Sequence, residues 1–268
     1  MIRDITLGQY YSCDSVIHRM DPRTKLLWTL LYMVALFLID EIYSYCAVIL
    51  FTALIIFCSN VPLKFILRGL RPILILVIFT ALLNLFLTKE GNILFEKGIF
   101  TITTGGVILA SKMAVRIMLL IMGTSLLTFT TSPTVLTSGM ESLLFPLKKI
   151  GVPVSVFVMM ISIALRFIPT LLDETDKIIK AQTSRGANFE HKNPLKKIKS
   201  MIPILIPLFV SAFRRADDLA VAMECRCYNG SAPRTSYRKL RFGKSDLSAL
   251  VFTVLMSAII VLIEVLNK

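Results

Sequence analysis

Two helix-like runs between residues 171 and 228 end on an arginine, the first as Ala181-Gln182-Thr183-Ser184-Arg185-Gly186 and the second as Ala222-Met223-Glu224-Cys225-Arg226-Cys227. In each run an aspartate precedes the arginine by nine residues (Asp176 and Asp217) and an alanine precedes it by four. Apolar runs of near-membrane length surround this polar stretch, so we expect it to lie outside a bilayer. The matched ends indicate two cationic helix tips that dock onto a soluble partner.

Plain helix capping is the alternative reading of these tips. Glycine is a common C-terminal signal, as in Arg185-Gly186, and a cation at a helix end is favoured by the helix dipole. Capping does not explain why both tips share the same offsets. The small neighbours Ser184, Gly186, Cys225 and Cys227 would let a guanidinium enter a groove and donate several directed hydrogen bonds.

The composition is that of an integral membrane protein. The 268 residues are 55% hydrophobic, and the mean hydropathy of +0.74 exceeds that of ordinary soluble domains. The formal charge of +13 comes from basic residues that flank apolar runs, which is typical of membrane topology rather than of nucleic-acid binding. The five cysteines do not suggest a disulfide framework, and residues 1–25 do not read as a cleavable signal.

Five apolar runs are predicted to cross the membrane, at residues 26–39, 43–58, 72–88, about 107–131 and 247–266. A tight hairpin at Asp40-Glu41 is favoured over a single long span, because the latter would bury two carboxylates. Residues 89–104 are expected to form an outer loop. Most Lys and Arg residues lie in 1–25, 61–71 and 132–245, so the N-terminus and the large loop are expected in the cytoplasm and the C-terminus outside.

The expected fold class is all-α, with polytopic membrane helices and a cytoplasmic coupling domain of long amphipathic helices. Residues 1–131 would hold the N-terminal segment and transmembrane helices 1–4, 132–245 the cytoplasmic or interfacial coupling domain, and 246–268 the final transmembrane helix. Two long helices are predicted, at 152–184 and 201–227, each about 40–50 Å long.

The apolar beginning of the first long helix, residues 154–168, could span the membrane or lie on it. Ser155, Ser162, Arg166 and Asp173 recur at spacings of seven and four, which places a polar stripe along one helix face. The return segment, 201–213, is short for a span and contains two prolines. We therefore favour a pair of helices at the inner interface, with a spanning hairpin as the alternative.

The sequence shows no catalytic constellation and no cofactor or metal site. Gly243-Lys244-Ser245 resembles the end of a phosphate-binding loop, but Arg238 stands where that loop needs glycine, so we expect no direct ATP binding. Cys225-x-Cys227 lacks further metal ligands nearby. His18 and His191 are interpreted as solvated.

Charged residues inside the predicted spans are few. Glu264 is the only acid within a clear span and lies near its end, which argues against an intramembrane hydrolase or a proton relay. Lys112 and Arg116, four residues apart on one helix face, would either extend to the outer surface or line a helix interface.

The chain resembles the transmembrane T component (EcfT) of energy-coupling factor (ECF) ABC-type vitamin transporters over nearly its whole length. The resemblance is carried by Gly8-Gln9-Tyr10, His18-Arg19-Met20-Asp21-Pro22-Arg23-Thr24-Lys25, Ser184-Arg185-Gly186 and Cys225-Arg226-Cys227. It implies that each arginine motif ends a coupling helix and enters a groove on one of two ABC-type ATPase subunits. In that family, Ala and Gly more usually flank the second arginine.

The resemblance further implies a non-catalytic subunit of the cell membrane that passes ATP-driven motion to a separate S component, which captures the vitamin. The apolar faces of residues 154–168 and 201–213 would contact that S component through Val158, Ile161, Leu165, Ile204 and Leu208. The identity of the vitamin would be set by the S component.

Two other functions remain open from the residues. A self-contained permease would bind solute between its own helices and should show polar or broken-helix residues at mid-membrane, where only Lys112 and Arg116 qualify. A membrane scaffold without a transport role is the other. We expect the lipid bilayer as a partner in each case, and no nucleic acid.

Overall fold

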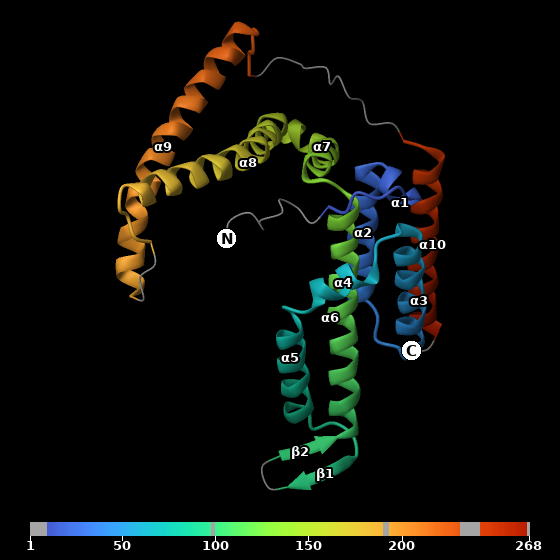
Figure 1. The fold of residues 1–268 in the computed structure, drawn as a ribbon. Coiled ribbons are helices and arrows are strands. Elements are labelled where there is room, and N and C mark those ends of the chain that lie inside the picture. The colour runs from blue at the N-terminus through green and yellow to red at the C-terminus, as the bar shows by residue number, and fades with distance from the viewer. Residues whose placement is uncertain (1–9, 98–99, 190–192, 231–241, 267–268) are drawn as a thin grey trace. The chain divides into compact units, whose positions relative to one another are not determined.

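The computed structural model describes residues 10–97, 100–189, 193–230 and 242–266 and confirms the all-α class (Figure 1). Gly8, Gln9, His191 and Arg238 lie outside the described residues. The helices are α1 (Val16–Arg19), α2 (Pro22–Phe37), α3 (Ile42–Ser59), α4 (Leu63–Leu70), α5 (Leu74–Leu87), α6 (Thr104–Thr130), α7 (Pro133–Leu144), α8 (Val154–Ser184), α9 (Pro194–Cys225) and α10 (Lys244–Leu266), with a 3-10 helix at Phe145–Ile150.

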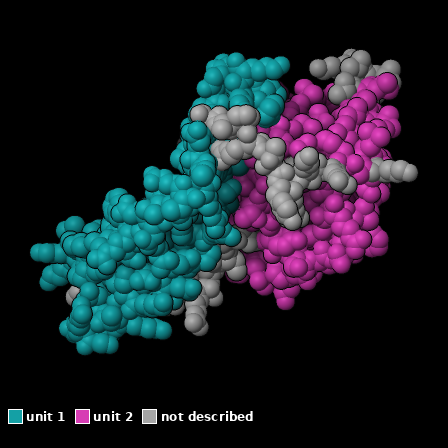
Figure 2. Space-filling view, turned by 90° about the horizontal axis from the view of Figure 1, so that it is seen from above, with its two compact units in different colours: residues 1–7, 144–239 teal, residues 8–143, 240–268 magenta. Residues whose placement is uncertain are grey.

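The chain divides into two compact units, coloured separately in Figure 2. The first, called here the membrane unit, comprises residues 8–143 and 240–268. The second, the arm unit, comprises residues 1–7 and 144–239 and contains α8 and α9. Helix α7 packs on the start of α2, where Gly139 approaches Pro22, and so belongs to the membrane unit.

Helix α6 is the central element of the membrane unit and packs against α2, α3, α4 and α5. Its 27 residues give a length of about 40 Å. By length and composition α3, α6 and α8 could each cross a membrane, and α4 with α5, which meet at a bend of 56°, could form a fourth span. The predicted hairpin at Asp40-Glu41 is confirmed as the turn between α2 and α3.

Part of the predicted outer loop is a β-hairpin. Strands β1 (Ile93–Lys97) and β2 (Phe100–Thr103) pair antiparallel between α5 and α6. Thr103 then caps α6, because its side-chain oxygen accepts a hydrogen bond from the Gly106 amide at 3.1 Å. The hairpin therefore continues directly into the central helix.

A close approach between α2 and α6 centres on Gly123, which lies against the ring of Tyr32. The Tyr32 hydroxyl is 3.0 Å from Thr52 Oγ1 and donates a hydrogen bond of 3.0 Å to the Leu119 carbonyl. One aromatic side chain thus joins α2, α3 and α6. Around it packs the main apolar core, formed by Leu36, Ile39, Tyr45, Val48, Phe51, Leu119 and Ile260.

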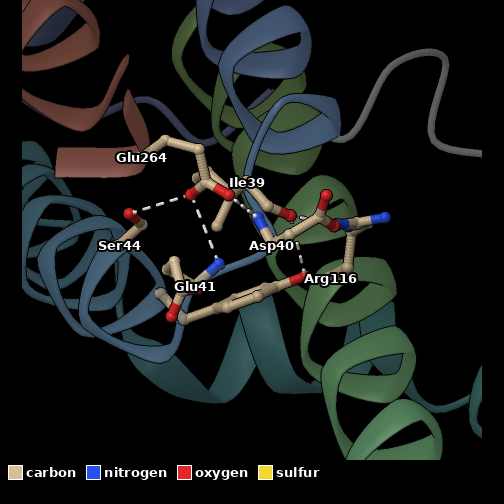
Figure 3. Close-up of polar contacts among 7 residues, drawn as sticks. Ile39, Asp40, Glu41, Ser44, Arg116 and Glu264 are labelled. Atoms are coloured by element: carbon tan, nitrogen blue, oxygen red, sulfur yellow. Dashed lines mark hydrogen bonds and ion pairs between the residues drawn. The ribbon is translucent and has the colours of Figure 1, made fainter. Parts of the chain in front are cut away.

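At one end of the membrane unit, the carboxylate of Glu264 accepts hydrogen bonds from the last two amides of the α2–α3 turn (Figure 3). The distances are 3.1 Å to the Asp40 amide and 3.2 Å to the Glu41 amide, and the Ser44 hydroxyl donates to the same group at 3.4 Å. The side chain of Glu41, the N-cap residue of α3, makes no capping bond. The buried Glu264 on α10 instead holds the two residues that precede α3, through their amides, and the Ser44 hydroxyl in its first turn.

Arg116 lies at the same turn (Figure 3). Its contacts distinguish between the two predicted placements, at the outer surface or at a helix interface. Its guanidinium donates to the Ile39 carbonyl and forms a 3.2 Å ion pair with Asp40, while lying 5.9 Å from the centre of the Tyr45 ring. Arg116 therefore lines the interface of α2, α3 and α6. Lys112, one turn away, is partly exposed.

At the opposite end of α2, Lys25 is buried and all three of its ammonium protons have acceptors. Its Nζ donates to the carbonyls of His18 at 3.3 Å and Thr130 at 2.9 Å, and to Thr131 Oγ1 at 3.2 Å. Thr130 is the last residue of α6, so a cation satisfies a helix C-terminus that would otherwise leave carbonyls unpaired. Through Thr130, Lys25 joins the start of α2 to the end of α6.

Two aspartates complete this junction. Asp21 caps α2 by accepting from the Arg23 amide at 2.9 Å, and its own amide donates to Asp246 of α10 at 2.7 Å.

His18 is half-buried rather than solvated, and its ring nitrogens bond to Ser15 Oγ at 2.7 Å and to the Tyr11 carbonyl at 2.9 Å. Partial burial lowers the pKa of the His18 imidazole below its ordinary value.

We predict opposite effects for two glycine-to-alanine changes. Gly123→Ala should destabilise the chain by about 1–3 kcal/mol, because the added methyl group overlaps the Tyr32 ring. Gly69→Ala is the control, since its methyl group meets only Ser125 Oγ at 3.7 Å, and it should stabilise α4 by up to about 1 kcal/mol. Thermal unfolding in detergent measures both, and equal shifts would contradict the close α2–α6 approach.

Candidate docking site at the tips of two long helices

The two predicted long helices are present as α8 and α9. Helix α8 has 31 residues and α9 has 32, and both continue through internal prolines at Pro169, Pro203 and Pro207. Helix α9 begins earlier than the predicted residue 201, because Asn193 caps it by accepting from the Leu195 amide at 3.2 Å and Pro194 occupies its first turn. An asparagine followed by proline is a helix-start signal that could have located this boundary.

Helices α8 and α9 cross in an antiparallel sense within the arm unit. Arg215 of α9 pairs with Glu174 of α8 at 3.5 Å, whereas Gln182, later in α8, donates to the carbonyl of Pro203, earlier in α9, at 3.4 Å. An open apolar hollow of about 280 Å³ lies between the helices. Its lining includes the predicted stripe of α9, formed by Ala216, Leu219, Ala220 and Met223, and Leu171 of the α8 stripe.

The antiparallel crossing places Arg185 and Arg226 at opposite ends of the pair. Arg185 lies eleven residues beyond Glu174, and Arg226 lies eleven residues beyond Arg215. At 1.5 Å per residue the two tips are separated by about 30 Å. The two arginines are therefore equally far along their helices from the Glu174–Arg215 ion pair. At this separation they cannot both bind one small ligand.

The backbone at the two tips is the same. In α8 the Gly186 amide donates to the Thr183 carbonyl at 3.0 Å and the Ala187 amide to the Gln182 carbonyl at 3.0 Å. In α9 the equivalent bonds join the Cys227 amide to Glu224 at 2.8 Å and the Tyr228 amide to Met223 at 3.0 Å. Each set is a Schellman cap, with the arginine as the capping residue. The repeat seen in the sequence is thus a repeat of local structure.

Cys227 occupies the left-handed position that Gly186 occupies in the first tip. Its φ is 56°, against 86° for Gly186. A side chain in this region costs about 1 kcal/mol relative to glycine. The second tip is therefore closed by the same cap at a higher local free energy.

All six predicted docking residues are exposed: Ser184, Arg185, Gly186, Cys225, Arg226 and Cys227. Neither guanidinium forms a hydrogen bond or ion pair with another described residue. The Ser184 hydroxyl is turned back onto the Lys180 carbonyl at 3.0 Å, which leaves the arginine unobstructed on that side. An exposed, unpaired guanidinium at a rigid helix end can donate a planar set of hydrogen bonds to carboxylates or carbonyls of a partner.

The five residues predicted to contact an S component differ in exposure. Ile161 is exposed, Leu165, Ile204 and Leu208 are partly buried, and Val158 is buried. The larger exposed apolar surface on α9 lies within the predicted 201–213 stretch but on residues other than the two singled out there: Met201, Ile202, Leu205, Ile206, Phe209, Val210 and Phe213. The spacing of four between Leu205, Phe209 and Phe213 is a signal that could have identified this face.

Comparison with known proteins gives the family. The family described as "Cobalt transport protein" (CbiQ) matches residues 14–237. The chain belongs to this family. Three relatives are each named "Energy-coupling factor transporter transmembrane protein EcfT": one from Ruminiclostridium cellulolyticum is 52% identical over 98% of both chains, one from Clostridium kluyveri is 49% identical over 100% of this chain and 98% of its own, and one from Bacillus subtilis is 44% identical over 97% and 98%.

These relatives confirm the resemblance to EcfT proteins of ECF transporters. Together with three or four helices that are long and apolar enough to cross a membrane, they identify a multi-pass membrane protein. The match with CbiQ extends from α1 to beyond α9, so it includes both arginine tips.

We predict that the two tips respond oppositely to reciprocal changes at the left-handed position. Cys227→Gly should stabilise the end of α9, and Gly186→Ala should destabilise the end of α8, each by about 1 kcal/mol. Hydrogen exchange of the Tyr228 and Ala187 amides, which close the two caps, reports each effect separately. Faster exchange at Tyr228 in Cys227→Gly would contradict the assigned cap.

Proposed function

We propose that this chain is the non-catalytic coupling subunit of an ECF transporter for vitamin or other micronutrient uptake. Two ABC-type ATPase subunits dock on Arg185 and Arg226, and a substrate-binding S component contacts the apolar faces of α8 and α9. The observation that carries this proposal is the pair of matching Schellman caps at opposite ends of the antiparallel helices α8 and α9, each with an exposed arginine that pairs with no other described residue.

The tips suit two copies of one kind of partner. Because both caps have the same hydrogen bonds and the same arginine, two partner grooves of the same chemistry can bind them. Because the tips are about 30 Å apart, two protein subunits rather than one small ligand would occupy them. Two similar ATPase subunits, each with a groove of carbonyl or carboxylate oxygens, meet both conditions.

The arms suit the transmission of force. When the ATPase pair closes or opens on ATP binding and hydrolysis, each arginine moves with its subunit. A continuous helix transfers that displacement along its axis, and the Glu174–Arg215 ion pair joins the two helices at their crossing. The open hollow beside this pair leaves room for the crossing angle to change without breaking a packed core.

The S component would bind the exposed apolar face of α9. Phe209 and Phe213 are 60% and 68% exposed, which is unusual for adjacent turns of one helix unless a partner or lipid covers them. Aromatic side chains of this kind are typical anchors of protein interfaces. On α8, Phe157, Met160 and Ile161 offer a further exposed apolar surface.

The proposed orientation follows from charge. Basic residues in 1–25, 61–71 and 132–245 put the N-terminus and the arm unit on the cytoplasmic side of the cell membrane, where ATPase subunits reside. A self-contained permease is less favoured, because Arg116 is already paired with the α2–α3 turn rather than with a solute site. Along the arms, α8 and α9 would lie at the inner interface, with the spanning hairpin as the alternative.

We predict that Arg185→Ala or Arg226→Ala lowers the affinity for the ATPase subunits by about 30-fold or more, because a desolvated, hydrogen-bonded charge is lost. Arg185→Lys should not restore it, since an ammonium lacks the planar fork. The exposed Lys180→Ala on α8 is the control with the same change in charge. Co-purification and vitamin uptake measure the effect, and full assembly and uptake in both alanine variants would refute docking.

We predict that Phe209→Ser reduces co-purification of the S component about tenfold or more while the ATPase subunits remain bound, because it removes an exposed apolar anchor and leaves both arginines and their caps unchanged. Val221→Ser, also on α9 and 59% exposed but outside residues 201–213, is the control. Quantifying the S component against the ATPases in the purified complex gives the result. Unchanged S-component content in Phe209→Ser would place that surface elsewhere.

A further inference from the structure

Helix α4 and its C-cap residue, Arg71, carry three cations on one face. Lys64, Arg68 and Arg71 are spaced by four and three residues, so they lie within one narrow arc of the helix. All three are exposed, and none forms an ion pair with an acid in the described part of the chain. Arg68 is braced by the ring of Phe65, whose centre is 5.7 Å from its guanidinium carbon.

The rest of α4 fixes this face in place. Ile66 is buried against Val61, Leu126 and Phe129, which anchors the helix to α6. Leu63 and Leu67 are 60% and 56% exposed and flank the cationic arc. An exposed apolar strip next to a strip of cations is the pattern of a helix that lies in the interfacial layer of a membrane.

An apolar groove of about 680 Å³ begins beside α4 and runs between α3 and α6. Its walls are the α3 side chains Ile49, Ala53, Ile56 and Phe57 and the α6 side chains Val115, Met118 and Met122, and its near end is closed by Asn60, Pro62 and Leu63. From Ile49 to Asn60 the groove follows α3 for about 16 Å. Pro62 and Leu63 therefore belong both to the end of the groove and to the start of the cationic helix.

We propose that this groove and the cationic face of α4 together bind one anionic phospholipid. One acyl chain lies in the groove between α3 and α6, and the phosphate lies against Lys64, Arg68 and Arg71. The site depends only on the membrane position of α3 and α6, and not on the roles assigned to α8 and α9.

Charge and shape together favour this occupant. An acyl chain matches an apolar groove that lies along two helices capable of crossing the membrane. The three cations of the adjoining helix form no ion pair with a described acid, so they favour a negatively charged head group, since a zwitterionic one supplies no net charge to offset them. By the distribution of basic residues this end faces the cytoplasm, where anionic lipids are attracted to juxtamembrane basic segments.

The cationic half of the site is tested with the purified full chain. Native mass spectrometry and titration in phosphatidylcholine nanodiscs with added phosphatidylglycerol should show preferential retention of phosphatidylglycerol. The triple change Lys64→Gln, Arg68→Gln and Arg71→Gln should lower its affinity about 100-fold, and Arg68→Gln alone about fivefold. Lys196→Gln, Lys197→Gln and Lys199→Gln remove the same charge from an exposed part of α9 and should leave the affinity unchanged.

The groove is tested with a second pair of variants. Ala53→Trp fills it and should reduce phosphatidylglycerol retention at least tenfold, whereas Leu54→Trp, on the same helix but outside the groove, should not. Equal binding of phosphatidylcholine and phosphatidylglycerol, or undiminished binding by the triple or Arg68→Gln variants, would overturn the proposal. So would an Ala53→Trp chain that keeps its lipid but loses a membrane-protein partner, because the groove would then belong to that partner.

Discussion

Helix ends near a lipid environment must have their backbone groups satisfied by protein, and in this molecule the ends are paired across helices. Glu264 from α10 accepts from the two amides just before α3, and Arg116 from α6 donates to the carbonyl of Ile39, just after α2. An unpaired amide or carbonyl there would cost several kcal/mol. These two charged side chains therefore fix a short α2–α3 turn, and with it the packing of four helices around Tyr32 and Leu119.

The other end of the same bundle meets the same constraint with the same two kinds of bond, from carboxylates to amides and from a cation to a carbonyl. Lys25 satisfies the last carbonyl of α6, and Asp21 and Asp246 join the starts of α2 and α10. The stretch from His18 to Lys25, which carries much of the family resemblance, therefore has a structural explanation: three of its polar side chains close the junction. Hydrogen bonds between helices thus hold both ends of the bundle. The exposed surfaces of α4 and of the groove beside it take no part in these bonds and remain available for lipid.

Most of the arm unit is predictable from local sequence signals. The 3.6-residue spacing of apolar residues located α8 and most of α9, and the repeated arginine offsets located both tips, because helix periodicity and capping are local properties. The predicted start of α9 is too late because the residues before 201 are rich in lysine, and the apolar spacing that indicates a helix becomes clear only after them. Within the predicted contact stretch 201–213, the sequence singles out Ile204 and Leu208 rather than the more exposed Phe209 and Phe213, because an apolar run does not show which side a neighbouring helix covers.

The sequence by itself determined the all-α membrane class, the hairpin at Asp40-Glu41 and the two arginine tips, since each depends on composition, charge distribution or local backbone signals. Only the tertiary structure showed that Glu264 and Arg116 serve a turn more than 70 residues away in the chain, that His18 is held by its neighbours, and that the tips lie at opposite ends of an antiparallel pair. Such contacts join residues far apart in sequence. Their geometry follows from how helices pack, and no local pattern encodes it.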